Sequence, residues 1–301
     1  MQSASCVAMV RPAAFGFNEQ TAANNFFQDH AEKNNARLQS DALQEFDAMV
    51  SLLRENQIEV IVLQDSAEPP KPDAIFPNNW FSCRNGQITV FPLFAPNRRL
   101  EKRLELIKQI KSLANTNIIK DLSVYEREQR FLEGTGSMVF DHENRTIYAC
   151  LSGRTDQELF EKFAREQGYV PVAFEAADEN GRDIYHTNVM LCIGSKFAVI
   201  CSAAIADSIE RQFILEMLSA SGHEIIDISF EQMRFFAGNM LQLRDPQGRL
   251  YLLMSSTAQN SLTMEQILSL QKFCSFIIPD VSHIEKAGGG SVRCMVAEIF
   301  Y

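Results

Sequence analysis

A repeat of about 55 residues constrains the fold of this chain more than any other feature. Five segments carry apolar residues at helical spacing, at 41–56, 97–113, 155–167, 207–219 and 263–273. Their first residues lie 56, 58, 52 and 56 positions apart (97−41, 155−97, 207−155, 263−207). Several segments begin with Asp, Asn or Thr, which cap helix N-termini well. The near-constant step predicts five copies of one structural unit.

Short apolar runs typical of β-strands follow the five expected helices, at 58–63, 118–122, 169–174, 224–228 and 276–278. Hairpins precede four of the helices, at 80–93, 138–151, 189–202 and 240–255, with turns at 84–86, at 142–144, near Gly194 and at 246–248. The predicted unit is therefore strand, strand, helix, strand. The first helix has no hairpin before it, but strands at 6–10 and 294–300 supply one if the two ends of the chain pair.

Closing the first unit on the last gives a predicted α/β fold, a five-bladed pseudo-symmetric ββαβ propeller in which each blade meets two neighbours. Residues 1–301 would then form one domain. An open α/β sheet in two domains is the alternative, because 301 residues correspond to about two domains of ordinary size. No low-complexity linker divides the chain, which favours the propeller.

Composition excludes several classes of partner. The formal charge of −10 comes from acids spread along the chain, and no cluster of Lys and Arg alternates with aromatic residues, so neither nucleic acid nor an acidic membrane is an expected partner. No basic leader or long apolar run occurs, which predicts a soluble, cytoplasmic protein. Seven scattered cysteines, mostly within apolar runs, indicate reduced thiols, and no Cys or His spacing suggests a metal site.

One residue at the start of the first strand of each unit carries chemistry. These residues are Asn79, Glu133, His186, Asn239 and Cys294, separated by 54, 53, 53 and 55 positions (133−79, 186−133, 239−186, 294−239). Equivalent positions in a ring converge on its axis. A thiolate is a strong nucleophile, a neighbouring imidazole can move its proton, and a carboxylate can orient the imidazole. Glycines at 134, 136 and 288–290 let the backbone approach a ligand closely.

Each of these residues has an ordinary structural interpretation when taken alone. His186 could bond a backbone group, Cys294 could be buried packing, Glu133 could cap a helix, and Asn239 could end a strand. The triglycine lacks the Lys of a phosphate-binding loop. Only the shared period supports a catalytic interpretation.

Several motifs along the whole chain carry a family resemblance. They are Val10-Arg11-Pro12, the segment Pro72-Asp73-Ala74-Ile75-Phe76-Pro77-Asn78-Asn79, Leu132-Glu133-Gly134, Leu151-Ser152-Gly153-Arg154-Thr155, His186-Thr187-Asn188, and Gly288-Gly289-Gly290-Ser291-Val292-Arg293-Cys294. With these motifs the chain resembles the guanidine-modifying superfamily, the pentein fold of arginine deiminases, dimethylarginine dimethylaminohydrolases and amidinotransferases.

The resemblance implies roles for individual residues. It makes Cys294 the nucleophile, His186 the acid and base, and Glu133 their partner, which also contacts a substrate nitrogen. It makes Asp73 a substrate-binding acid and assigns Arg98 and Arg154 to the substrate carboxylate. It implies a small amino-acid substrate and no metal or organic cofactor, and it leaves assembly into a homo-oligomer open.

Three departures from the superfamily pattern bear on the substrate. Asn78, Asn79 and Asn188 stand where relatives that act on arginine compounds carry acids. An amide can donate to a ureido carbonyl and accept from its N–H groups, whereas a carboxylate can only accept. We therefore expect a neutral ureido substrate, with citrulline hydrolysed to ornithine, ammonia and carbon dioxide, as in the citrulline-utilisation hydrolases that share the Phe-Pro-Asn-Asn-Trp segment. The alternatives are an arginine deiminase, a dimethylarginine hydrolase, an amidinotransferase, or a non-catalytic amino-acid-binding protein on the same fold.

Overall fold

The computed structural model describes residues 1–31, 37–113, 116 and 118–300. Its strands fall into five units of three, each with one antiparallel and one parallel pairing around a central strand. The units are β15(Ala297–Ile299)–β1(Cys6–Arg11)–β2(Glu59–Gln64), β3(Phe81–Arg84)–β4(Gln87–Val90)–β5(Ile118–Asp121), β6(Val139–Asp141)–β7(Thr146–Cys150)–β8(Val170–Phe174), β9(Leu191–Ile193)–β10(Phe197–Ile200)–β11(Glu224–Asp227) and β12(Leu241–Arg244)–β13(Leu250–Leu253)–β14(Ser275–Ile277). The order of strands predicted from the repeat is therefore confirmed.

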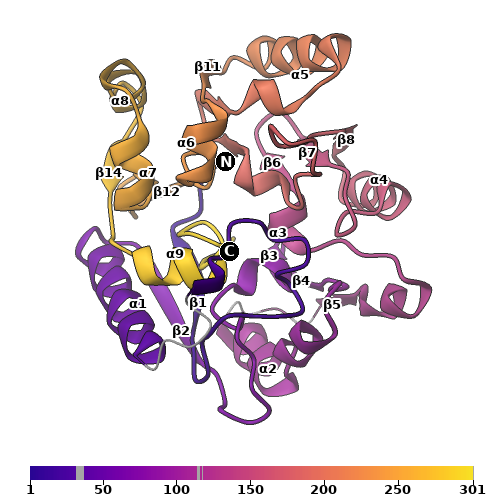
Figure 1. Cartoon of the computed structure of the whole chain (residues 1–301), viewed down its shortest axis with the longest axis vertical. Coiled ribbons are helices and arrows are strands. Elements are labelled where there is room, and N and C mark those ends of the chain that lie inside the picture. Colours follow the sequence, from indigo (N-terminus) through magenta and orange to yellow (C-terminus); the bar gives the residue numbers. More distant parts are fainter. Residues whose placement is uncertain (32–36, 114–115, 117, 301) are drawn as a thin grey trace.

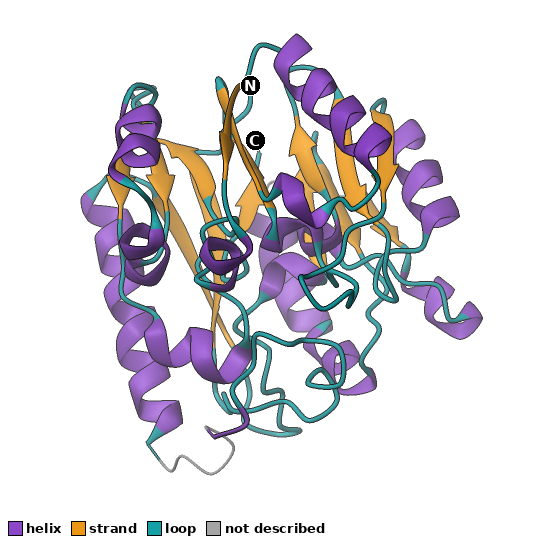
Figure 2. Cartoon of the chain, turned by 45° about the horizontal axis from the view of Figure 1, so that its top comes forward, coloured by secondary structure: helices purple, strands orange, loops and turns teal. Residues whose placement is uncertain are grey.

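A helix links the central strand of each unit to the parallel strand. These helices are α1(Leu38–Glu55), α2(Leu104–Leu113), α4(Gln157–Glu166), α5(Ser208–Ala220) and α8(Met264–Gln271), and they lie on the outside of the strands (Figure 2). Asp207 and Thr263 cap α5 and α8 with their side chains, as the sequence predicts. The cap of α4 is Asp156, one residue after the predicted Thr155. Shorter helices α3(Gly134–Ser137), α6(Phe230–Arg234), α7(Ser256–Ser261) and α9(Ser282–Gly288) complete the set in the described residues.

The helix predicted at 97–113 is wrong over its first turn. Pro96–Glu101 forms a 3₁₀ helix, and α2 begins only at Leu104. Arg98 and Glu101, three positions apart, are both buried and paired with each other. Side chains at i and i+3 eclipse in a 3₁₀ helix, which places this pair on one inward side. The first helix also starts earlier than predicted, with Arg37 at its N-cap.

The two ends of the chain meet in one unit. Strand β1 pairs antiparallel with β15, with Cys6 opposite Ile299, and a single bridge from Ile299 to Cys83 joins this unit to the next. Figure 1 shows the units arranged around the middle of the molecule, with the C-terminus near the centre. The described strands form one six-stranded and three three-stranded sheets that do not close into a ring. Strand pairing therefore supports a mixed α/β fold of repeated units and does not confirm the closed propeller.

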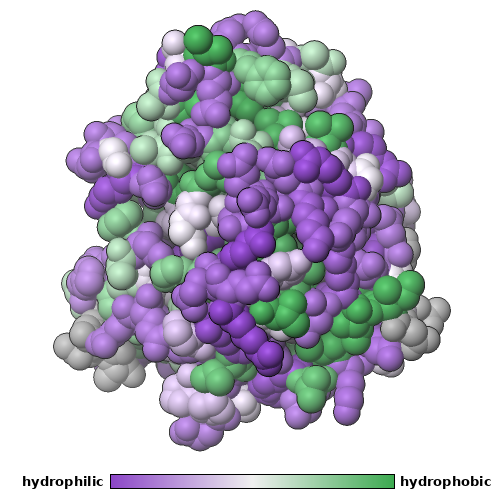
Figure 3. All heavy atoms as spheres, turned by 90° about the vertical axis from the view of Figure 1, so that its right-hand side faces the viewer, coloured by the Kyte–Doolittle hydropathy of each residue, from purple (hydrophilic) through white to green (hydrophobic). Residues whose placement is uncertain are grey.

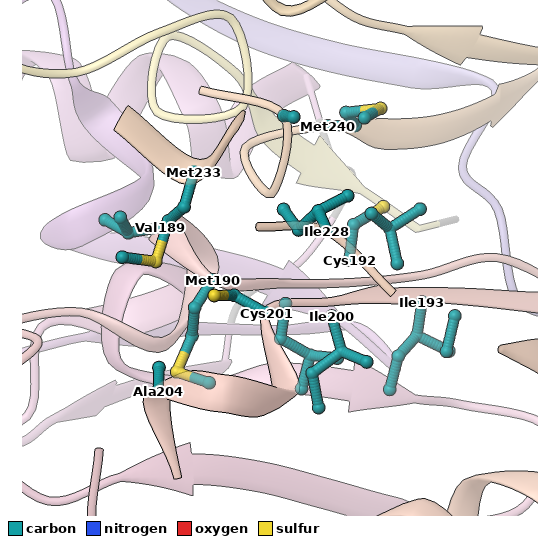
Figure 4. Packing of buried hydrophobic residues seen from close by; sticks show 14 of the residues in the cluster. Val189, Met190, Cys192, Ile193, Ile200, Cys201, Ala204, Ile228, Met233 and Met240 are labelled. Carbon is teal, nitrogen blue, oxygen red and sulfur yellow. The ribbon is translucent and has the colours of Figure 1, made fainter. Parts of the chain in front are cut away.

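Buried apolar side chains fill the space between the strands and the outer helices. In the cluster of Figure 4, Cys192 and Cys201 lie among methionines and isoleucines such as Met190, Ile200 and Ile228. Burial raises the pKa of the Cys192 thiol to about 12 and that of Cys201 to about 11, so both remain protonated and behave as small hydrophobic groups. None of the seven cysteines, all of which lie in the described part of the chain, forms a disulfide.

The outer surface is mixed in character. One face, shown in Figure 3, is mainly hydrophilic, and its apolar areas lie in separate patches. Among the described residues, none of the helices combines the length and the apolar character that a membrane crossing requires.

Candidate active site

The five equivalent residues lie in short turns that lead into the first strands of the units. Asn79 ends the 3₁₀ turn Pro77–Asn79, Glu133 precedes α3, and His186 precedes the 3₁₀ turn Thr187–Val189. Cys294 lies three residues before β15. All five side chains are buried. Each unit of the repeat therefore places one polar side chain in the interior of the protein.

His186 is held by Glu133. Its Nε2 lies 2.7 Å from Glu133 Oε2, and Arg154 Nη1 donates to the same oxygen at 3.4 Å. Burial alone would raise the pKa of Glu133, but Arg154 and the His186 hydrogen bond hold it well below its usual range. An ionised Glu133 accepts a hydrogen bond from the Nε2–H group of His186. Nδ1 is then the imidazole nitrogen that can take up a proton. Burial lowers the pKa of His186 to about 4, despite the carboxylate beside it.

Cys294 lies against two amides. Asn239 Nδ2 donates to the sulfur at 3.4 Å and Asn188 Nδ2 at 3.6 Å. Burial raises the pKa of the Cys294 thiol, and the Asn239 hydrogen bond opposes this shift. The resting site therefore holds a neutral thiol and a neutral imidazole, and the two amide groups can stabilise the thiolate once it forms.

A second group of charges surrounds Asp73. Asn18 Nδ2 donates to Asp73 Oδ2 at 2.7 Å, and Arg98 Nε lies 3.7 Å from the same oxygen. Arg98 forms a bidentate pair with Glu101 at 2.8 and 2.9 Å. Arg98 also donates from Nη1 to Asn79 Oδ1 at 2.6 Å. Most donors of Arg98 are thus used inside the protein.

These groups border one small pocket of about 270 Å³. Asp73, Asn79, Arg98, Arg154, His186 and Cys294 line it, together with Asn25, Phe76, Tyr185 and Gly288–Gly290. An added Cβ at Gly290 would lie 3.0 Å from the Phe76 ring and 3.3 Å from Cys294 Cβ. Glycine at this position therefore leaves room for both side chains. Of the residues predicted to contact substrate, Asn78 and Glu133 do not line this pocket. Glu133 is fully buried and hydrogen-bonded to His186.

Asn78 contributes its backbone instead. Its carbonyl oxygen accepts from the Thr135 hydroxyl at 3.4 Å, and an added Cβ at Gly134 would lie 2.2 Å from that oxygen. Both polar atoms of the Asn78 side chain are buried without a hydrogen-bond partner. Gly134 has a φ of +51°, so glycine is required at this position by both conformation and space.

Sequence reasoning missed the segment that covers the pocket, residues 18–28. Asn25 donates to the backbone carbonyls of Gly288 and Gly289, and Gln28 donates to that of Ala287. Arg154 donates to Thr21 O at 3.4 Å and to the side chain of Asn24. The segment lies outside the repeat, between the first strand and first helix, so the period could not assign it. Its run of Asn and Gln residues was the signal available.

Four polar atoms of the site are buried without a partner. They are Asp73 Oδ1, Asn79 Nδ2, Arg154 Nε and Asn188 Oδ1. A buried polar group without a partner costs about 1–3 kcal/mol. Two of these atoms are hydrogen-bond acceptors and two are donors, so a ligand that pairs with all four must carry both donors and acceptors. No group of three or more His, Cys, Asp or Glu residues in the described part of the chain could hold a metal ion.

Residues 11–301 match the family model described as N,N dimethylarginine dimethylhydrolase, eukaryotic. No curated protein matches the chain.

Several solved structures share its fold. ArgZ, an arginine dihydrolase from the ornithine-ammonia cycle in cyanobacteria, has a TM-score of 0.76 and 15% identity; the match covers 98% of this chain and 40% of that one. This chain therefore spans less than half of the full-length ArgZ chain. A variant N-terminal domain of ArgZ, covalently bonded to a reaction intermediate, has a TM-score of 0.75 at 15% identity, covering 98% and 97%. A dimethylarginine dimethylaminohydrolase adduct with S-methyl-L-thiocitrulline has a TM-score of 0.69 at 15% identity, covering 99% and 100%.

The repeated α/β fold and the match of residues 11–301 to the family model place the chain in the guanidino-modifying superfamily, the pentein fold. Because the family model matches nearly the whole chain, the protein belongs to the N,N-dimethylarginine dimethylhydrolase family.

Proposed function

We propose that this protein is a cysteine-dependent hydrolase of the carbon–nitrogen bonds of a small amino acid, and that its substrate is citrulline. Membership of the family supports a hydrolase of the guanidino type. The solved relatives are described with arginine and thiocitrulline compounds rather than citrulline, so the choice of citrulline depends on the pocket of this chain.

One observation carries that choice: the orientation of Asn79. Arg98 has only donors, so Asn79 must present Oδ1 to it. Its Nδ2 is left buried and unpaired at the pocket. A ureido group has a carbonyl oxygen that can accept from Nδ2. A guanidinium has no acceptor, and it would leave this donor unpaired.

The charges in and around the pocket also favour citrulline over arginine. Glu101 is paired with Arg98, and Glu133 with Arg154 and His186. Neither Glu101 nor Glu133 lines the pocket; Asp73 does, and one of its oxygens is unpaired. Citrulline, a zwitterion with a neutral side chain, leaves the charge of the pocket unchanged. Arginine adds a cation that Asp73 alone must balance along with the substrate ammonium.

The chemistry follows from the neutral Cys294–His186 pair. Nδ1 of His186 takes the thiol proton as the sulfur attacks the ureido carbon, and Asn239 and Asn188 stabilise the thiolate. The bond to one nitrogen breaks as that nitrogen receives the proton from His186. Water then attacks the carbonyl carbon of the S-carbamoyl intermediate with His186 as base, the C–S bond breaks, and the sulfur receives the proton from His186. The released carbamate decomposes to carbon dioxide and the second nitrogen product. Ornithine, ammonia and carbon dioxide are the products.

In this proposal Arg154 binds the substrate carboxylate through its free Nε, and Asp73 accepts from a substrate N–H. Arg98 positions Asn79 rather than binding the carboxylate, since its donors already serve Glu101, Asn79 and Phe76 O. Asn78 acts through its backbone. We further propose that residues 1–301 form a single five-bladed propeller domain in the cytoplasm, a proposal supported by the identical strand order of the units.

Arginine is the second candidate, favoured by the likeness to an arginine dihydrolase. Purified protein should be incubated separately with citrulline, arginine and dimethylarginine, and ammonia and amino-acid products measured. Ornithine from citrulline at the highest kcat/KM supports the proposal. Citrulline accumulating from arginine or dimethylarginine would identify a deiminase or dimethylarginine hydrolase instead. Amidino transfer from arginine to an amine would identify an amidinotransferase, and binding without turnover an amino-acid-binding protein.

A further inference from the structure

A second pocket lies along β3 and β6, strands that begin near the active site, and extends from Phe81 and Thr135 to Arg84 and His142 at their far ends. β3 starts two residues after Asn79 and ends at Arg84, and His142 directly follows β6. Four strand residues span about 13 Å. Arg84, His142 and Phe300 border this pocket, whose volume is about 540 Å³. None of its lining residues lines the active-site pocket.

Arg84 is the unusual residue of this pocket. Its Nε and Nη1 atoms are buried without a hydrogen-bond partner, and its guanidinium lies 4.3 Å from the centre of the Phe300 ring. An adjoining cavity of about 390 Å³ shares Phe140, His142 and Glu298 with the pocket and contains Gln242, whose Nε2 is also unpaired. Among described residues lining the two cavities, every buried atom without a partner is therefore a donor. The active site, in contrast, has unpaired atoms of both kinds.

The charges around the pocket are mainly positive. Arg293 donates to Glu298 at 3.1 Å, so the carboxylate of the pocket already has a cation. Among the described residues, Arg84 has Tyr169 as its hydrogen-bond partner and interacts electrostatically with Glu298, with no carboxylate hydrogen-bonded to its Nε or Nη1. Arg145 lies over the Tyr169 ring at 5.7 Å. Burial lowers the pKa of His142 well below its usual value, and Arg84, the N-terminal ammonium, Arg293 and Arg145 lower it further. A neutral His142 bonds the Tyr169 hydroxyl at 2.9 Å and adds no charge.

Aromatic rings form much of the remaining wall, from Phe140, Phe163, Tyr169 and Phe300. Phe140 and Tyr169 meet edge to face at 5.6 Å, and His142 lies 5.0 Å from Phe300. Such a wall suits a flat apolar group. A cation with two unpaired N–H groups at one side and rings at the other suit an amphipathic ligand.

We propose that this pocket is a binding site for a small organic anion, in which an acidic head accepts from the free N–H groups of Arg84 and an apolar or aromatic body packs among the rings. A charged acceptor satisfies the unpaired donors more strongly than a neutral one. The proposal does not depend on the substrate of the active site.

Isothermal titration calorimetry with benzoate tests the site. Benzoate should bind wild-type protein, whereas formate, which has the head alone, and benzyl alcohol, which has the body alone, should bind at least about 10-fold more weakly. Arg84→Gln should weaken benzoate binding at least about 10-fold, and Arg84→Lys should retain part of it because the cation remains. Arg234→Gln, at an exposed ion pair with Glu179, should change nothing.

Arg154→Gln separates the two pockets. If benzoate occupies the proposed site, this change in the active-site pocket leaves its affinity unaltered. Loss of binding in Arg154→Gln, equal binding in Arg84→Gln, or no binding to the wild type at about 10 mM would overturn the proposal. If circular dichroism shows that Arg84→Gln is unfolded, the test is the NMR signal of the Arg84 Nε–H group in wild-type protein. That signal must shift on addition of benzoate, and an unshifted signal contradicts the proposal.

Discussion

Arg98 donates from Nη1 to Oδ1 of Asn79 at 2.6 Å, and both side chains are buried. The bond determines which end of the Asn79 amide is left unpaired. Glu101 holds Arg98 in place from the other side. Arg98 and Glu101 thus fix the orientation of the Asn79 amide, and neither needs to touch the substrate. Substitution of Arg98, Glu101 or Asn79 should therefore change which substrate is preferred.

Substitution of Glu101 tests this support. Glu101→Gln leaves the buried Arg98 with a weaker partner, so the free energy of unfolding should fall by about 3 kcal/mol. kcat/KM should fall as well, because Asn79 is held less firmly. Urea unfolding and steady-state kinetics measure the two effects. Glu105→Gln is the control, since Glu105 is largely exposed; equal stability of the two variants would contradict the account.

Gly136 leaves room for Asn79 and His186. An added Cβ would lie 2.3 Å from Asn79 Nδ2 and 2.9 Å from the His186 ring, so Gly136→Ala must displace one of them. We expect kcat/KM to fall at least about 100-fold, because misplacement by about 1 Å has this effect on catalysis. Gly16→Ala, with no atom within 4 Å of the added methyl, should retain activity. Wild-type kcat/KM in Gly136→Ala would refute the arrangement.

Covalent catalysis by Cys294 has a direct signature. Cys294→Ala should abolish turnover while keeping the thermal midpoint within a few degrees, since the change removes only one sulfur atom. Rapidly quenched wild-type protein should show a mass increase from the bound substrate fragment in intact-protein mass spectrometry. Cys274→Ala should show the same adduct, and Cys294→Ala should not. An adduct in Cys294→Ala would assign the nucleophile elsewhere.

The buried imidazole makes stability depend on pH. The pKa of His186 is about 4 in the folded protein, below its ordinary value of 6.5, so between these values the unfolded chain binds a proton that the folded protein does not. Stability should therefore fall as pH drops from 6.5 to about 4, by roughly 3 kcal/mol. The lowered pKa of Glu133 acts in the same direction, with stability lost as pH falls through it.

Urea unfolding at several pH values measures this effect, and His186→Gln should show a smaller loss. The acid limb of kcat/KM should likewise lie near pH 4 in the free enzyme. An acid limb near 6.5, with unchanged stability below that pH, would mean that His186 is not buried beside Glu133 as described.

The sequence predicted what the repeat determines. Strand order and the pairing of the two chain ends follow from the period, because each unit places its first strand in the same way. The period also picked out Asn79, Glu133, His186, Asn239 and Cys294 as equivalent positions, and all five prove to be buried. It did not predict the 3₁₀ turn that buries Glu101, since an amphipathic pattern continues through it. It also could not place residues 18–28, whose contacts with Asp73, Arg154 and Ala287–Gly289 depend on tertiary packing alone.

The central claim is that an uncharged amide at position 79 selects a neutral ureido group. Its most direct test is the ratio of kcat/KM for citrulline to that for arginine, in wild type and in Asn79→Asp. A carboxylate cannot donate to the ureido oxygen, and it supplies the charge that a guanidinium lacks in this pocket. The account predicts a wild-type ratio above one and a decrease of about 10- to 100-fold in the variant. A wild-type ratio favouring arginine, or a ratio that Asn79→Asp leaves unchanged, would contradict it.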